Sequence, residues 1–237
     1  APAQARENRS DQMCDIATHF DHVRRIDEQD VVRLEPSLAR HVDSVLHVAQ
    51  TGNAVGDKPL DDPSFEPFFE AAQQLDMLLF VHPLEGGLDA DDPLSPILGN
   101  VLQFTFRTTL MVERMILKGM FENYPNLRLC LSHGGGLLAF NIWRLDHSYS
   151  LRPELKKSIR DKPSGYLRRL YFDTILHSTA ALQYLVKVVG ADRVVIGTDY
   201  PMAMGDFESL QKVMQLDLPP AEREWVLGGN AAQALNI

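Results

Sequence analysis

The feature that most constrains the fold is a short apolar run that stops at a histidine and three glycines. Residues 127–131 read Leu-Arg-Leu-Cys-Leu, and Ser132, His133 and three glycines follow directly. A short apolar run bounded by flexible backbone is typical of a buried strand in a parallel sheet. The run therefore predicts a strand that delivers the imidazole of His133 to the carboxyl end of a sheet.

Two other stretches share this design. Met77–Val81 is apolar and ends at His82, and the run that begins at Arg193 leads through Gly-Thr to Asp199. Because the carboxyl ends of parallel strands meet at one edge of a sheet or barrel, we expect these two side chains and His133 to form one site.

Strands and helices alternate over most of the chain. Apolar residues at helical spacing predict helices over 65–75, 109–118, 137–149 and 178–190, and Leu170–Thr174 is predicted to be a further strand. This alternation is typical of an α/β protein with a parallel sheet and helical crossovers. Candidate ligands at three or more strand ends favour a (β/α)8 TIM barrel. The alternative is an open doubly wound sheet, which gathers ligands at one or two switch points.

The remaining segments have weaker patterns. Near the N-terminus we expect helices over 12–19 and 36–43 and strands over 22–26 and 45–49. Residues 84–106 are rich in Gly, Pro and Asp and are predicted to form a long loop. Pro219-Pro220 is expected to open a last helix, which Gly228-Gly229 breaks before a short tail helix.

Composition limits the class of protein. The chain has 237 residues, which predicts a single domain over 1–237. The net charge of −9 argues against nucleic-acid partners and against binding to an anionic membrane surface. No apolar run approaches the roughly 18 residues of a membrane span. Two cysteines, Cys14 and Cys130, are too few for a disulfide framework, so we expect a reducing, cytoplasmic location.

Imidazoles and a carboxylate at adjacent strand ends predict a site for a divalent metal such as Zn²⁺. A catalytic zinc site has about three protein ligands and an open position. His82 and Asp199 are the candidate ligands, Asp199 is also a candidate proton carrier, and His133 is suited to ligation or to acid–base catalysis. The alternative is that each histidine is structural and that Asp199 only terminates a turn.

Three further residues are candidates for substrate binding. Arg144 and Arg152 can pair with a substrate carboxylate in a bidentate manner, or they can form a solvated basic face. His177 follows the strand predicted over 170–174, although Ser178 also explains a local turn there.

Together these motifs resemble a known family. Val-His82-Pro, Leu-Ser-His133-Gly-Gly-Gly, Tyr-Phe-Asp173-Thr and Ile-Gly-Thr-Asp199-Tyr-Pro, with the closing Gly-Asn230-Ala, are similar in order and spacing to the strand motifs of amidohydrolase-related proteins. The closest likeness is to the metal-dependent aminocarboxymuconate-semialdehyde and resorcylate decarboxylases. The similarity runs from about residue 45 to the end and more loosely back to about residue 8.

The resemblance implies a barrel of amidohydrolase type with one Zn²⁺, or sometimes Mn²⁺, held by His82 and Asp199. It implies that His133 is the acid–base residue in the decarboxylation of an unsaturated or aromatic carboxylic acid. It also implies that Arg144 reaches the site of a neighbouring subunit, which predicts a homodimer, and that Arg152 matches a second arginine of the family.

One departure from the family pattern is clear. The family begins with a strand that carries His-x-His or Glu-x-His, and no His-x-His occurs here; His19 and His22 have the wrong spacing. By the match, the first two strands are missing from this sequence, and we favour the omission of upstream residues over a truncated relative.

Two other functions remain open at this stage. A hydrolase or hydratase of the same superfamily would use a metal-activated water on a lactone, an ester or a double bond. A non-catalytic relative would keep the scaffold without the metal.

Overall fold

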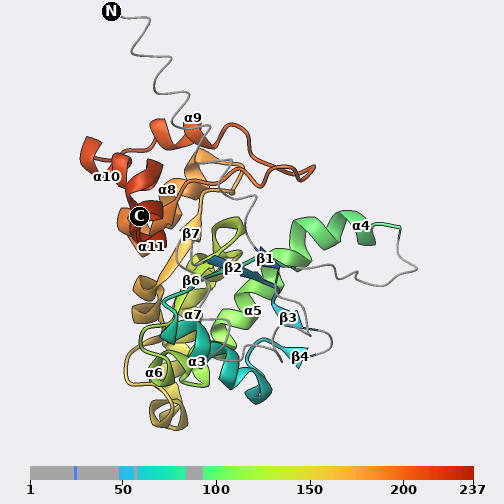
Figure 1. Cartoon of the computed structure of the whole chain (residues 1–237), viewed down its shortest axis with the longest axis vertical. Helices are drawn as coiled ribbons and strands as arrows, with labels where there is room; N and C mark the ends of the chain where they lie inside the picture. Colours follow the sequence, from blue (N-terminus) through green and yellow to red (C-terminus); the bar gives the residue numbers. More distant parts are fainter. Residues whose placement is uncertain (1–23, 26–47, 56–57, 84–92) are drawn as a thin grey trace, which may run out of the picture.

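The computed structural model describes residues 24–25, 48–55, 58–83 and 93–237, and their central feature is a parallel sheet (Figure 1). Its six strands, in sheet order, are β1 (Arg24–Arg25), β2 (Val48–Thr51), β5 (Leu78–Val81), β6 (Arg128–Leu131), β7 (Leu170–Asp173) and β8 (Val194–Val195). A separate antiparallel pair is formed by β3 (Ala54–Val55) and β4 (Lys58–Pro59).

The order of the strands in space is their order in the sequence, and all neighbours are parallel. A doubly wound sheet reverses direction at a switch point, whereas a barrel adds each strand on the same side of the previous one. The described strands therefore follow the winding of a barrel, as the sequence predicts.

The register places the strand ends at one level. Val81 pairs with Leu131, Leu131 with Phe172, and Phe172 with Val194. As a result, the residues that follow β5, β6, β7 and β8 emerge at the same edge of the sheet, which we call the carboxyl rim.

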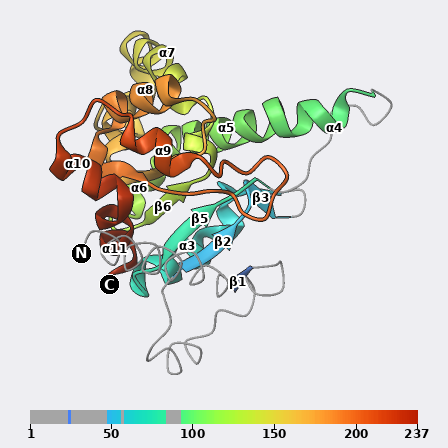
Figure 2. The same cartoon turned by 90° about the horizontal axis from the view of Figure 1, so that it is seen from above.

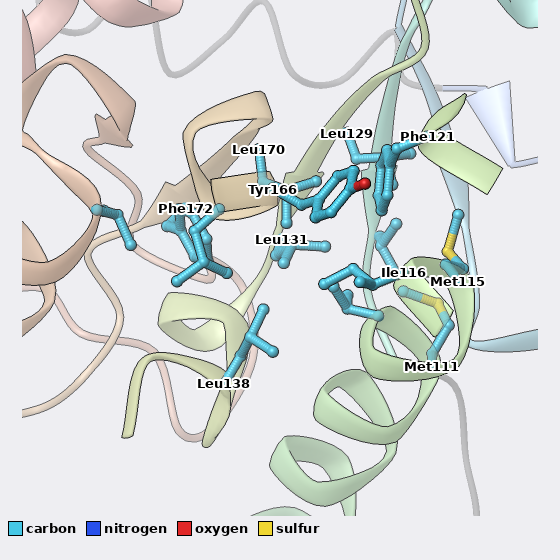
Figure 3. Packing of buried hydrophobic residues seen from close by; sticks show 14 of the residues in the cluster. Met111, Met115, Ile116, Phe121, Leu129, Leu131, Leu138, Tyr166, Leu170 and Phe172 are labelled. Carbon is cyan, nitrogen blue, oxygen red and sulfur yellow. The ribbon is translucent and has the colours of Figure 1, made fainter. Parts of the chain in front are cut away.

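Strands β2, β5, β6, β7 and β8 alternate their apolar side chains between two clusters. One set, with Leu79, Leu129 and Phe172, joins the larger cluster between the sheet and the helices (Figure 3). The other set, with Leu78 and Cys130, joins a smaller cluster on the opposite face. Burial on both faces explains why these strands read as continuous apolar runs.

Helices connect the strands, and most of them pack against the larger cluster. They are α3 (Glu66–Gln74), α4 (Ser95–Leu98), α5 (Phe104–Leu117), α6 (Met120–Asn123), α7 (Leu138–Leu151), α8 (Thr179–Val189), α9 (Ser209–Met214), α10 (Pro220–Glu224) and α11 (Asn230–Leu235). None of the helices in the described ranges is both long and apolar enough to cross a bilayer.

The helix over residues 178–190 is confirmed with its caps. The Ser178 hydroxyl accepts a hydrogen bond from Ala181 N at 3.4 Å, and Gly190 ends the helix with φ +91°. A hydroxyl cap at the start and a glycine with positive φ at the end are common signals for the bounds of a helix.

The prediction of a loop over residues 84–106 is wrong for its second half. Helix α4 begins at Ser95 with Pro96 in its first turn, and a π-helical turn over Gly99–Gln103 joins it directly to α5. The α4 end of the combined helix extends away from the rest of the molecule (Figures 1 and 2), whereas the second half of α5 packs into the core. The π turn inserts one residue into the helical repeat, and this hides the periodicity from a search at 3.6 residues per turn.

The predicted break at Gly228-Gly229 is also wrong. A π-helical turn over Trp225–Gly229 carries the chain from α10 into α11. A Cβ atom on Gly229 would lie 2.6 Å from the indole of Trp225, so this glycine permits close packing rather than ending the helix.

Four N-terminal predictions fall largely outside the described residues. The helices expected over 12–19 and 36–43 lie wholly outside them. Only Arg24–Arg25 of the strand expected over 22–26 is described, as β1, and the strand expected over 45–49 is described from Val48 onward, as β2.

A buried ion pair links the segment that precedes α3 to α5. The Asp61 side chain is fully buried and contacts Arg114 at 2.9 Å as well as Lys118. Burial works to raise the pKa of Asp61, but hydrogen bonds and charge from the two cations outweigh it and hold the pKa below its ordinary value.

We expect Asp61→Asn to lower the free energy of unfolding by about 1–3 kcal/mol at pH 7, because two charge-assisted interactions are lost. Since the folded-state pKa of Asp61 is depressed, its contribution is present above the unfolded pKa of about 3.9 and is lost as the pH falls through the folded value. Urea unfolding at pH 7 and at pH 3 measures the difference in free energy of unfolding between wild type and variant. We expect this gap to be smaller at pH 3. A gap that is constant or wider in acid would contradict this assignment.

Candidate metal centre

His82 is the first residue after β5 and lies at the carboxyl rim. Its N–H donates to the carbonyl of Thr51 on β2 at 3.0 Å, which extends the strand pairing by one residue. Nε2 of the ring is buried, lies 3.3 Å from Oδ1 of Asp199, and has no hydrogen-bond partner among the described residues. A buried imidazole nitrogen without a partner is costly unless something else binds it.

His133 follows β6 after Ser132, and a sharp turn aims its ring toward His82. The two ring centroids lie 5.0 Å apart at an interplanar angle of 64°. His133 has φ +54°, and Gly134 to Gly136 also have positive φ. Only glycine adopts this conformation freely, so the glycine run is what allows the chain to turn directly after the histidine.

Asp199 enters the site from the loop after β8. Its backbone has φ +58°, and the N–H of Asp206 donates to the carbonyl of Thr198 at 2.8 Å, which closes the loop. Oδ2 of Asp199 lies 3.8 Å from Nε2 of His133. The carboxylate therefore lies next to both histidines.

The three side chains are a compact set of metal-binding groups. One ligand atom from each of His82, His133 and Asp199 lies within 4.8 Å of the others, and all three residues are partly buried. Tetrahedral ligands at about 2.0–2.2 Å from Zn²⁺ are about 3.4 Å apart. The separations of 3.3 and 3.8 Å from the Asp199 oxygens to the two imidazoles are close to that value. His82 and Asp199 are thus spaced as ligands of one divalent cation, and the longer separation leaves the His133 ring beside that cation.

The negative charge of Asp199 and a positive charge on His133 stabilise each other. Burial works to raise the pKa of Asp199, but the neighbouring His133 and His82 lower it well below its usual range. Burial works to lower the pKa of His133, but Asp199 and the charge of Asp173 raise it above its ordinary value. The carboxylate is thus ionised at neutral pH, and it favours a proton on the His133 ring.

Backbone strain is concentrated at this rim. In the described part of the chain, the non-glycine residues with positive φ are Asp76, His133, His177, Asp199 and Asn236. Left-handed backbone costs a non-glycine residue about 1–2 kcal/mol and tends to occur at functional sites. Three of these five residues are candidates from the sequence.

The structure does not bring the other candidates into the three-residue set. The His177 side chain is 49% exposed at the rim and lies 3.9 Å from Asp206. Arg144 and Arg152 line an exposed hollow on α7 with Trp143 and His147. Helix α7 lies at the outer edge of the helical layer (Figure 2).

Asp173 is a residue of the site that sequence reasoning did not single out for a role. It ends β7, is 2% exposed, and accepts hydrogen bonds from the backbone N–H groups of His133 and Gly134 at 2.9 and 2.7 Å. Burial raises the pKa of its carboxyl, while the charge of His133 and the backbone donors oppose that shift. The sequence did contain a signal, since β7 is a buried strand that ends in a carboxylate and is the next strand after the one that leads to His133.

Comparison with known proteins places the chain in a family. The Amidohydrolase family model matches residues 11–237. The 2-amino-3-carboxymuconate-6-semialdehyde decarboxylase of Dictyostelium discoideum is 34% identical over 190 residues, which cover 79% of this chain and 53% of that protein. The gamma-resorcylate decarboxylase of Polaromonas sp. is 28% identical over 188 residues, covering 75% of this chain and 56% of that protein.

A solved structure agrees with these relatives. The 5-carboxyvanillate decarboxylase of Sphingomonas paucimobilis superposes with a TM-score of 0.72 at 28% identity, covering 88% of this chain and 62% of that one. The chain spans about half the length of the curated relatives it matches.

These matches confirm the resemblance expected from the motifs and the fold class, a (β/α)8 barrel of amidohydrolase type. The chain belongs to the amidohydrolase family.

Proposed function

We propose that this protein is a metal-dependent decarboxylase of an unsaturated or aromatic carboxylic acid. The observation that carries the proposal is the convergence of His82, His133 and Asp199 at one rim of the sheet. The decarboxylases among the relatives support this reaction class over hydrolysis. The domain boundaries, one domain over 1–237, belong to the same proposal.

His82 and Asp199 would hold the cation, with Zn²⁺ as our first choice and Mn²⁺ as the alternative. Imidazole suits zinc, whereas carboxylate ligands suit manganese as well. When bound, the cation would supply a Lewis acid that polarises a substrate oxygen.

His133 would move the proton. Its ring lies beside the cation ligands, and Asp199 favours the protonated form. When the bond to the carboxylate group breaks, CO₂ leaves and the electron pair stays on the substrate carbon. The imidazolium of His133 would give its proton to that carbon and then recover one from solvent.

Arg144, Arg152 and His177 would bind the substrate. Guanidinium groups pair with carboxylates through two parallel hydrogen bonds. Because Arg144 lies on an exposed face of α7, we propose that it serves the site of a second subunit in a homodimer. The buried free thiol of Cys130 is consistent with our proposal of a reducing, cytoplasmic location.

Loss of the carboxylate at position 199 should remove the cation. We expect wild type to bind Zn²⁺ at close to one per chain and Asp199→Asn to bind it at least ten times more weakly, because an amide oxygen carries no charge. Asp192→Asn is the matched control, since Asp192 precedes β8 and pairs with Arg168 at 2.8 Å. Competition titration with a chromophoric chelator measures the affinity. Equal affinity in wild type and Asp199→Asn would rule out Asp199 as a ligand.

His133→Asn should separate catalysis from metal binding. We expect kcat for decarboxylation to fall about 10²–10⁴-fold, the usual contribution of a general acid, while affinity for the metal changes less than threefold. CO₂ release from a panel of unsaturated and aromatic acids, run beside a panel of lactones, gives the rates. Metal-loaded protein that releases no CO₂ from any acid would overturn the proposed reaction, and turnover of a lactone would point to hydrolysis.

The proposed dimer has its own test. Phe140 on α7 is 79% exposed, and Trp143 beside Arg144 is 52% exposed. Buried aromatic groups commonly anchor subunit contacts, so we expect Phe140→Asp to convert a dimer into a monomer in light scattering. Met214→Asp, at a 53% exposed position on α9, should leave the dimer intact. A wild-type protein that is monomeric at all concentrations would contradict the dimer.

A further inference from the structure

The Asp173 carboxylate collects three backbone donors at the end of β7. Oδ2 accepts from His133 N at 2.9 Å, and Oδ1 accepts from Gly134 N at 2.7 Å and from Ile175 N at 3.0 Å. Two of these donors, His133 N and Gly134 N, are consecutive along the chain and lie in the turn after the neighbouring strand β6. Consecutive N–H groups that converge in this way form an anion-binding concavity, which here is filled by a side chain of the protein itself.

The turn that Asp173 holds is strained and tightly enclosed. His133 is in the left-handed region at φ +54°, which a histidine adopts only when its surroundings hold it there. A Cβ atom on Gly134 would lie 2.6 Å from the side chain of Leu176, and one on Gly136 would lie 2.2 Å from the carbonyl oxygen of Thr105. Packing thus restricts the glycines, and the carboxylate of Asp173 fixes the N–H groups that orient the histidine.

We propose that Asp173 is a positioning residue that locks the strained turn so that the His133 imidazole faces Asp199 and His82. It acts through the backbone of His133 and touches neither substrate nor cation. The expected change in rate rests on the proposed function, since it requires that the protein is a decarboxylase. The expected change in the position of the His133 ring does not.

Position 173 needs a carboxylate because three backbone N–H groups donate to its side chain. An amide has one acceptor oxygen and one NH₂ group, so Asn would turn its NH₂ toward at least one of the three backbone N–H groups. The donor that faces the NH₂ loses its partner in a site that is 2% exposed. Whichever way the amide is oriented, the turn loses at least one contact that defines its shape.

The rival reading is that Asp173 contributes only to stability. Asp61→Asn is the matched control, since Asp61 is also a buried carboxylate whose donors come from distant residues, and it lies outside the site. Both variants should lower the midpoint of urea unfolding. Only Asp173→Asn should disturb His133.

The direct measurement is the imidazole nitrogen NMR spectrum of the metal-free protein, with His133 assigned from the signal lost in His133→Asn. We expect the His133 ring signals to shift or broaden in Asp173→Asn and to stay in place in Asp61→Asn. If Asp173→Asn does not fold, Asp173→Ser keeps one acceptor oxygen without the opposing NH₂ and is read by the same signals.

Kinetics provide the second measurement. Misplacement of a reacting group by about 1 Å can cost about 10²-fold in rate, so we expect kcat to fall about 10–100-fold in Asp173→Asn, with KM changed less than threefold. In the His133→Asn background the same change should cost no further rate, because Asp173 acts through His133.

Unmoved His133 signals together with a kcat equal to that of Asp61→Asn would overturn the proposal. An additive loss in the double variant would overturn it as well. If the wild type decarboxylates no acid, the proposed function fails, and the NMR comparison still decides whether Asp173 positions the ring.

Discussion

The parallel register of β5, β6, β7 and β8 is the constraint on which the rest of the structure depends. Because Val81, Leu131 and Phe172 lie at matching levels, the residues that follow them emerge at the same edge. Backbone hydrogen bonds between strands hold this alignment, and burial of both faces of the sheet prevents slippage, since a shift by one residue would exchange the two apolar clusters. The strand register therefore brings the members of the candidate metal centre to one edge of the sheet.

Backbone strain at the rim lies in the turns that follow the strands and carry the polar groups. His133 and Asp199 both adopt left-handed backbone, and each is held by contacts made elsewhere. The glycine run and Asp173 hold the first, and the loop closed between Thr198 and Asp206 holds the second. Pre-organisation of this kind would hold the imidazoles and the carboxylate in place for the proposed cation before it binds.

The sequence predicted the parts that follow from local pattern. Strands that are apolar on both faces and end at His82, His133 or Asp199 were recognisable, because burial and the strand ends both leave a signal in the chain. The helix over 95–117 was predicted only in its second half, because a π turn shifts the apolar repeat by one residue. The contacts of Asp173 could not be predicted from the sequence. Its carboxylate binds backbone N–H groups after the neighbouring strand, and almost any residue type can supply such a group.

The most direct test of the account is a crystal of the protein loaded with Zn²⁺ or Mn²⁺, measured with X-rays at the metal's absorption edge. The account predicts one anomalous peak per chain, within about 2.3 Å of Nε2 of His82 and of a carboxylate oxygen of Asp199, with the His133 ring beside it. An anomalous peak elsewhere in the molecule, with the rings of His82 and His133 turned away from Asp199, would contradict it.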